Sequence, residues 1–216
     1  MDIQTNKIRT GLVLPGGGAR GAFQVGVLKA VGEMLPAGAP NPFAVISGTS
    51  AGAINSVVLA SRARRFRSAV AELSRVWGHF SCEQVFRCDN LTMLKSSLHW
   101  LSAIVLGGAI VGAPRSLLDN APLRELLARN VRFPRIQDAI DHGYLDAVAI
   151  TAAGYSSARS TSFFQAASDS RQWNRTRRIG IRRSLGLDHL MASIAVPMVF
   201  PPVRLENEFF GDGAMR

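Results

Sequence analysis

The chain has 216 residues, of which 47% are hydrophobic and 19% are charged. This length and balance fit a single globular domain, residues 1–216, and exclude a disordered or low-complexity chain. The formal net charge is +10 and 22 of the 25 cationic residues are arginine, which favours an anionic partner or surface.

The N-terminal part of the chain alternates predicted strands and helices. Residues 8–14 are an apolar run that ends at a proline and three glycines, which predicts a strand entering a loop. Apolar residues recur every four positions over 23–35, which predicts a helix. Residues 43–47 predict a second strand, and 51–60 a helix packed closely on it. Strands that alternate with helices favour a parallel sheet covered on both faces.

The middle of the chain is mainly helical, and strand patterns return after it. We expect helices over 66–79, 98–112, 123–130 and 135–141, strands over 145–153, 161–166 and 177–183, a short helix over 188–195, and a last strand over 206–210. No repeat or linker marks a second domain.

Features that bear on location and metal binding are few. Residues 1–12 are polar and lack the apolar core of a secretory signal. The most apolar stretch, 98–113, is short of the roughly 20 residues of a membrane span, so a core helix is favoured over an interfacial segment. We expect a cytoplasmic or peripheral membrane protein. Cys82 and Cys88 are typical of a reducing compartment, and with His79 they match no zinc pattern, so no metal site is predicted.

One serine stands between two glycines in Gly48-Thr49-Ser50-Ala51-Gly52, where the predicted strand gives way to a helix. This is the layout of a nucleophile elbow, in which a sharp turn exposes the serine Oγ and small neighbours leave room for a strained backbone. Ser50 also lies near a helix N-terminus, which favours developing negative charge. The motif is short, so an ordinary loop remains the alternative when it is taken alone.

Gly16-Gly17-Gly18-Ala19-Arg20-Gly21 formally satisfies GxGxxG, follows a strand and opens a helix. A dinucleotide site would also need an acidic residue at the end of the second strand, but 36–52 contain no Asp or Glu. No Lys-Ser or Lys-Thr pair completes a Walker A motif either. Glycines that let backbone N–H groups approach an oxyanion are the better interpretation. Arg20 either steers an anionic substrate or supports the loop, and the second role is favoured.

Ser50 needs a base, and the histidines offer none in a recognisable catalytic setting. An α/β-hydrolase triad has the order Ser, acid, His, and no histidine follows Asp212. Asp212 precedes a glycine at the end of the last predicted strand, so a turn is the alternative role. An aspartate within hydrogen-bond reach of the hydroxyl can act as the base itself. We expect structural or surface roles for all four histidines, His79, His99, His142 and His189.

Taken together, the glycine loop, the Ser50 motif and Asp212-Gly213-Ala214 resemble the patatin-like phospholipase family. Ala192-Ser193-Ile194-Ala195-Val196-Pro197, with Phe200-Pro201-Pro202-Val203, resembles the segment that this family carries before its last motif. The resemblance spans residues 12–214, and all motifs in this order and spacing are specific to the family.

The resemblance implies a three-layer α/β/α fold with a mainly parallel central sheet and a Ser–Asp dyad. Ser50 would be the nucleophile and Asp212 the proton acceptor in hydrolysis of acyl esters of phospholipids or related lipids, with no cofactor and no metal. The oxyanion hole would comprise Gly16, Gly17 and Gly18, and the supporting residues Arg20, Gly21, Gly48, Gly52 and Gly213. Because the family typically continues past this motif, we expect a domain shortened at its C-terminus.

Three alternatives accompany this hypothesis. The first is a general esterase or thioesterase. The second is a basic, catalytically impaired module that binds the anionic surface of a membrane, motivated by the net charge of +10 and by the end of the chain soon after Asp212. The third is a nucleotide-dependent enzyme that uses the glycine loop. Nucleic acid is not expected as a partner. Two arginine-rich runs suit nucleic acid or anionic lipid head groups, but a solvated face is the favoured role of each. The runs comprise Arg62, Arg64, Arg65 and Arg67, and Arg171, Arg175, Arg177, Arg178, Arg182 and Arg183.

Overall fold

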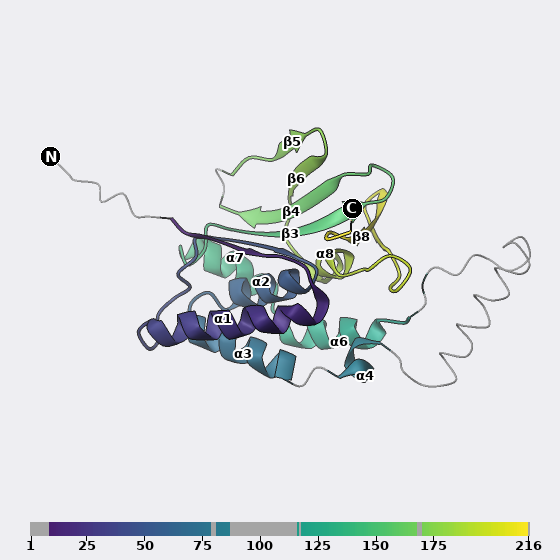
Figure 1. Ribbon diagram of the computed structural model, residues 1–216. Coiled ribbons are helices and arrows are strands. Elements are labelled where there is room, and N and C mark those ends of the chain that lie inside the picture. Colours follow the sequence, from purple (N-terminus) through teal and green to yellow (C-terminus); the bar gives the residue numbers. More distant parts are fainter. Residues whose placement is uncertain (1–8, 79–80, 87–115, 117, 168–169, 216) are drawn as a thin grey trace, which may run out of the picture.

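The computed structural model describes residues 9–78, 81–86, 116, 118–167 and 170–215 (Figure 1). The order of elements is β1 (Gly11–Leu14), η1 (Gly18–Arg20), α1 (Gly21–Met34), β2 (Val45–Thr49), α2 (Ala51–Ser61), α3 (Phe66–Gly78), α4 (Cys82–Val85), α6 (Ala121–Asn130), α7 (Pro134–Asp141), β3 (Ala147–Gly154), β4 (Ser160–Ala166), β5 (Trp173–Arg175), β6 (Arg178–Arg182), α8 (Leu187–Ser193), β7 (Val203–Leu205) and β8 (Glu208–Asp212).

The strands of the described residues form one sheet in the order β1-β2-β3-β4-β6-β5, and β8 pairs with β3 and β7. The first three strands are parallel, as the predicted alternation of strands and helices requires, and β4 and β6 are also parallel to each other. The pairs β3–β4, β3–β8, β5–β6 and β7–β8 are antiparallel. The predicted α/β fold with parallel strands at its centre is confirmed.

Strands β2 and β8 share one edge of β3. β4 pairs with the other edge of β3, from Ala147 to Ala153. On the shared edge, β2 pairs with β3 up to Thr151, and β8 pairs with β3 from Ala152 onward. Because β2 runs parallel to β3 and β8 runs antiparallel to it, the C-terminal ends of β2 and β8 meet at this point. The residues that follow β2 and those that end β8 are therefore brought together.

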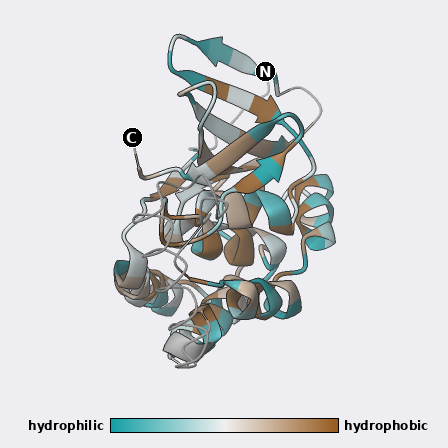
Figure 2. Cartoon of the chain, turned by 90° about the vertical axis from the view of Figure 1, so that its right-hand side faces the viewer, coloured by the Kyte–Doolittle hydropathy of each residue, from teal (hydrophilic) through white to brown (hydrophobic). Residues whose placement is uncertain are grey.

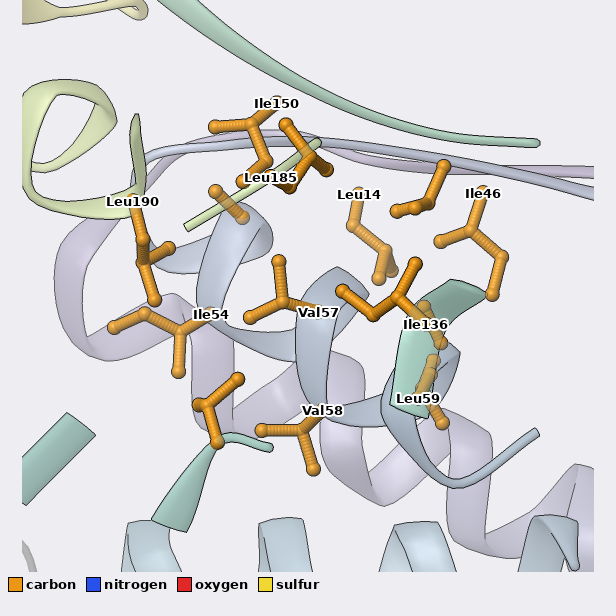
Figure 3. Close-up of a cluster of buried hydrophobic side chains, with 14 of the residues drawn as sticks. Leu14, Ile46, Ile54, Val57, Val58, Leu59, Ile136, Ile150, Leu185 and Leu190 are labelled. Atoms are coloured by element: carbon orange, nitrogen blue, oxygen red, sulfur yellow. The ribbon is translucent and has the colours of Figure 1, made fainter. Parts of the chain in front are cut away.

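The hydrophobic core surrounds α2, between the sheet and the outer helices. Every residue of α2 is buried, and the labelled side chains Ile54, Val57, Val58 and Leu59 pack beneath sheet residues such as Ile46 (Figure 3). In Figure 2 hydrophobic segments gather in this interior, and the outer helices mix hydrophilic with hydrophobic segments. Burial of this apolar surface is the dominant favourable term in folding.

The labelled helices lie together on one face of the sheet (Figure 1). On the other face, Val13 and Val45 are exposed. A helical layer over that face therefore stays a prediction for this chain. Within the described residues, no helix combines the length and apolarity that crossing a bilayer requires.

Most predicted elements occur within a few residues of their expected bounds, and the differences lie in the short hairpins. The single last strand over 206–210 was wrong in detail: β7 and β8 form a hairpin that turns at Glu206, whose φ is +53°. β6 confirms the strand predicted over 177–183, but its hairpin partner β5 was missed because three exposed residues carry no alternation of apolar and polar positions. The predicted helix over 98–112 lies outside the described residues.

Candidate functional site

The glycine loop and Ser50 follow neighbouring strands and so lie at one edge of the sheet. Leu14 of β1 pairs with Gly48 of β2, and the chain leaves the sheet directly after each of these two strands. A Cβ atom added to Gly16 would lie 3.0 Å from the Ser50 Cβ and 2.9 Å from the Ala214 Cβ. Three segments far apart in sequence therefore meet at the carboxyl ends of the parallel strands, where ligand sites of α/β sheets occur.

Ser50 is the N-cap of α2 and has φ +55° and ψ −127°. Such a conformation is sparsely populated for a residue with a Cβ and costs about 1–3 kcal/mol, so it persists only where its surroundings hold it. The surroundings here are close-packed. A Cβ on Gly48 would lie 2.4 Å from the Gly52 carbonyl oxygen, and one on Gly52 would lie 2.0 Å from the Leu14 carbonyl oxygen. Both glycines are therefore required by close backbone approach.

Asp212 is 2% exposed and lies opposite Ala152 of β3. Its Oδ2 accepts a hydrogen bond from the Ser50 Oγ at 2.6 Å, and its Oδ1 accepts one from the Ala214 N–H at 2.8 Å. Burial raises the pKa of this carboxyl above the usual aspartate value, and the hydrogen bonds from Ser50 and Ala214 lower it in part. A Cβ on Gly213 would lie 2.2 Å from the Thr151 carbonyl oxygen, so this position also needs glycine.

The glycine loop has an unusual backbone. Gly17 has φ +159° and Gly18 has φ +54°, and among the described residues none accepts a hydrogen bond from either of these N–H groups. Arg20 closes the loop, because its N–H donates to the Gly17 carbonyl at 3.1 Å and its side-chain stem lies against Gly17. No carboxylate pairs with Arg20 in the part of the chain that the structure describes. The role of Arg20 in supporting the loop stays a prediction, and the contact that favours it is the packing of its side-chain stem against Gly17.

A buried polar network behind the loop joins three helices. Asn55 of α2, which is fully buried, donates from Nδ2 to the Gly21 carbonyl at 3.1 Å and to the Gln24 Oε1 at 2.9 Å. Its Oδ1 accepts from the Trp77 Nε1 of α3 at 2.8 Å, and Gln24 donates to the Pro15 carbonyl at 2.7 Å. The network anchors both ends of the glycine loop. The sequence did not predict this network, because Asn55, Gln24 and Trp77 each lie in a helix and belong to no motif.

Ser193 is a second contact that sequence reasoning missed, although it lies inside the segment quoted for the family resemblance. Its Oγ accepts a hydrogen bond from the Ser50 N–H at 3.0 Å and donates one to the Thr151 carbonyl at 2.7 Å. Tyr155 also lies close to the site: burial and the nearby Asp212 carboxylate raise its pKa. The resemblance of that segment assigned no role to Ser193, and no motif contains Tyr155.

Two of the four histidines fall within the described residues, and both make structural contacts. The His142 Nδ1 lies 2.7 Å from the Asp138 carbonyl oxygen, and its ring stacks on Tyr144. His189 accepts from the Gly186 N–H at 3.1 Å, and burial lowers its pKa, which favours the neutral ring. Neither hydrogen-bonds to Ser50 or Asp212. Within the described ranges, no three His, Cys, Asp or Glu side chains are grouped as metal ligands.

Comparison with known proteins identifies a similar fold and a family. VipD from Legionella pneumophila is 14% identical, with a TM-score of 0.54 over 96% of this chain and 46% of VipD. The ExoU–SpcU structure from Pseudomonas aeruginosa is 21% identical over 74% of this chain and 35% of the matched chain, with a TM-score of 0.42. This chain thus spans less than half of either. No curated protein matches it significantly. The patatin-like phospholipase model matches residues 12–216, and the chain therefore belongs to the patatin-like phospholipase family.

Proposed function

We propose that the protein is a lipid acyl hydrolase that cleaves fatty-acyl esters with Ser50 and Asp212 as a catalytic dyad. The observation that carries the proposal is the 2.6 Å hydrogen bond from the Ser50 Oγ to the Asp212 Oδ2 across 162 positions of sequence. A carboxylate in this position can take the proton of the serine hydroxyl directly, so no histidine is needed between them. Membership of the patatin-like phospholipase family supports the same chemistry.

The reaction would proceed in two steps. The Ser50 Oγ attacks the ester carbonyl carbon while Asp212 accepts its proton, and collapse of the tetrahedral intermediate expels the alcohol, which takes that proton, leaving an acyl-Ser50 ester. Asp212 then accepts a proton from water, whose oxygen attacks the acyl carbonyl carbon. The second collapse breaks the bond to the Ser50 Oγ, releases the fatty acid and returns the proton to Ser50.

The glycine loop supplies the oxyanion donors in this proposal. The Ser50 N–H already donates to the Ser193 Oγ, so it is not free for the developing oxyanion. The Gly17 and Gly18 N–H groups have no acceptor among the described residues, and Gly16 lies directly against Ser50. Prearranged backbone donors of this kind stabilise the charge of the transition state, and losing one typically costs about 10²–10³ in kcat.

Exposed apolar side chains in the chain segments that carry the site residues favour a lipid substrate. Met215 follows Asp212 by three residues and is 51% exposed, and Met198, in the segment after Ser193, is 62% exposed. Phe23, in the first turn after the glycine loop, and Tyr155, beside Asp212, are exposed as well. Acyl chains of a lipid are apolar partners that such side chains suit.

Active-site labelling combined with a lipid panel tests the proposal. We expect a fluorophosphonate to modify Ser50, identified by mass spectrometry of the labelled peptide, and the same preparation to release fatty acid from phospholipid vesicles. Hydrolysis of short soluble esters or thioesters without release from lipids would support a general esterase or thioesterase instead. A protein that neither labels nor hydrolyses any ester would contradict the proposed activity.

The pH dependence follows from the burial of Asp212. The base must be ionised, and burial raises its pKa, so kcat/KM should rise with pH and reach half its plateau above the pKa of an ordinary aspartate. The measurement is kcat/KM for a soluble ester between pH 4 and 8, with circular dichroism at each pH as a control for folding. A rate that stays level down to pH 4 would contradict this role of Asp212.

A second candidate function, binding of an anionic membrane surface, is favoured by a basic hollow between α2, α3 and α7. The hollow has a volume of about 570 Å³, and Arg64, Arg65 and Arg135 line it together with one carboxylate, that of Asp138. It lies beside the C-terminal end of α2, whereas Ser50 caps the N-terminal end, about 16 Å away along an eleven-residue helix. The hollow is therefore not part of the site at Ser50.

Charge reversal at the hollow separates the two candidates. Arg64→Glu combined with Arg65→Glu should weaken binding to vesicles that contain phosphatidylserine by about tenfold or more, because each basic residue near such a surface contributes about 1 kcal/mol. Co-sedimentation measures the binding, and Arg159→Glu combined with Arg204→Glu, both outside the hollow, is the control with the same change of net charge. Equal loss in both variants would indicate a nonspecific effect of net charge. Ester hydrolysis in solution should be unaffected in either variant.

A further inference from the structure

Ser193 is the last residue of α8 and is fully buried. Its hydroxyl makes two hydrogen bonds, accepting from the Ser50 N–H at 3.0 Å and donating to the Thr151 carbonyl at 2.7 Å. One side chain of α8 therefore joins the backbone of the residue after β2 to the backbone of β3. Water cannot replace it readily, because the hydroxyl has no exposed surface.

The position of this hydroxyl explains how the chain leaves the sheet at Ser50. Thr49 is the last residue of β2 to pair with β3, and its partner is Thr151. The Ser193 Oγ stands between the next N–H, that of Ser50, and the Thr151 carbonyl, where a further ladder bond would otherwise run. Both backbone groups keep a hydrogen-bond partner while Ser50 turns to φ +55°. Buried backbone groups need such partners.

The same segment also holds the other half of the dyad. The Asp212 N–H donates to the Ala195 carbonyl at 2.8 Å, two residues after Ser193. The end of α8 and the residues that follow it thus contact the backbone of both Ser50 and Asp212, at the point where the ends of β2 and β8 meet. The distance between the Ser50 Oγ and the Asp212 Oδ2 depends on this short stretch of chain.

We propose that Ser193 is a positioning residue for ester hydrolysis, an inference that rests on the proposed function of Ser50 and Asp212. Its hydroxyl holds the Ser50 backbone in the strained conformation that directs Oγ toward Asp212 and the glycine loop. Removing the hydroxyl lets Ser50 relax toward a direct contact with β3 and lengthens the distance from Oγ to Oδ2. Ser193 touches no substrate in this role, so substrate binding stays as it is.

The test is Ser193→Ala compared with two other variants. Ser193→Ala should lower kcat for a soluble ester by about 10- to 100-fold, as displacement of a reacting group by about 1 Å does, with KM changed by less than about twofold. Fluorophosphonate labelling of Ser50 should slow by the same factor. Ser193→Cys keeps the volume but hydrogen-bonds weakly, so it should lose activity similarly. Ser61→Ala, which removes a buried hydroxyl bonded to the Val58 carbonyl at the far end of α2, should leave kcat unchanged.

Several results would overturn the proposal. The first is a folded Ser193→Ala variant that retains the wild-type kcat. The second is a Ser193→Cys variant that retains the wild-type kcat, which would show that the volume of the side chain matters rather than its hydroxyl. If Ser193→Ala does not fold, Ser193→Cys carries the kinetic test. A wild-type protein that neither labels nor hydrolyses contradicts the proposed function alone. In that case a crystal structure of either Ser193 variant tests the positioning role. A Ser50 that keeps φ near +55° and its hydrogen bond to Asp212 would overturn this role, and a displaced Ser50 would support it.

Discussion

Ser50→Ala and Asp212→Ala should each lower kcat for ester hydrolysis by about 10⁴-fold or more, because residues of one catalytic unit cannot act singly. Ser50→Ala removes the atom that forms the acyl-enzyme. Asp212→Ala removes the acceptor of the 2.6 Å hydrogen bond and leaves the serine proton without a base. The double variant should be no slower than the slower single variant, since each already abolishes the same step. Initial rates with a soluble ester, over several enzyme concentrations, measure these losses.

Matched controls exclude a general effect of alanine at serine or aspartate positions. Ser74→Ala removes a hydroxyl that donates to the Val70 carbonyl within α3, and Asp141→Ala removes an exposed carboxylate that accepts from Gln137 in α7. Both should retain the wild-type kcat. If Ser50→Ala retained hydrolysis and the fluorophosphonate labelled another residue, the nucleophile would lie elsewhere. If Asp212→Ala retained hydrolysis, Asp212 would not be the base.

Gly52→Ala should destabilise the protein by about 3 kcal/mol or more and remove activity with the fold. Its Cβ would lie 2.0 Å from the Leu14 carbonyl oxygen and 2.7 Å from that of Pro15, and both atoms belong to backbone that cannot rotate away. To relieve these clashes, the first turn of α2 would have to move away from β1, and this movement would also displace Ser50. Urea unfolding followed by circular dichroism measures the loss.

Gly26→Ala is the control for this glycine. Gly26 lies on the exposed side of α1, and an added Cβ there would have no neighbour within 4 Å. Alanine should therefore stabilise the protein by about 0.5–1 kcal/mol through its better helix propensity. If Gly52→Ala unfolded at the wild-type urea concentration, the close packing of α2 on β1 at the candidate site would be wrong.

Much of the fold could be predicted because its signals are local. The alternation of strands and helices between residues 8 and 60 depends on the period of the apolar residues and on glycine and proline at the ends of elements. The elements β1, α1, β2 and α2 accordingly occur close to their predicted bounds. β5 and β7, the three-residue partners of β6 and β8, escaped prediction because they are short and contain no buried residue, so pairing with a neighbouring strand rather than apolar periodicity determines them.

Part of the candidate site could likewise be predicted from local signals, and part could not. The sequence by itself determined the candidate chemical groups: a serine between glycines after a strand, a glycine loop after another strand, and an aspartate with no histidine after it. These signals are readable because each depends on residue type and on the element that precedes it.

Only the tertiary structure decided that these groups meet and what holds them. The direction of β8 along the edge of β3 brings Asp212 to Ser50, and pairing direction is set by contacts between residues far apart in the chain. The Ser193 hydroxyl and the Asn55 network are likewise invisible in sequence, because a buried hydrogen-bond partner is defined by its place in space and not by its neighbours in the chain.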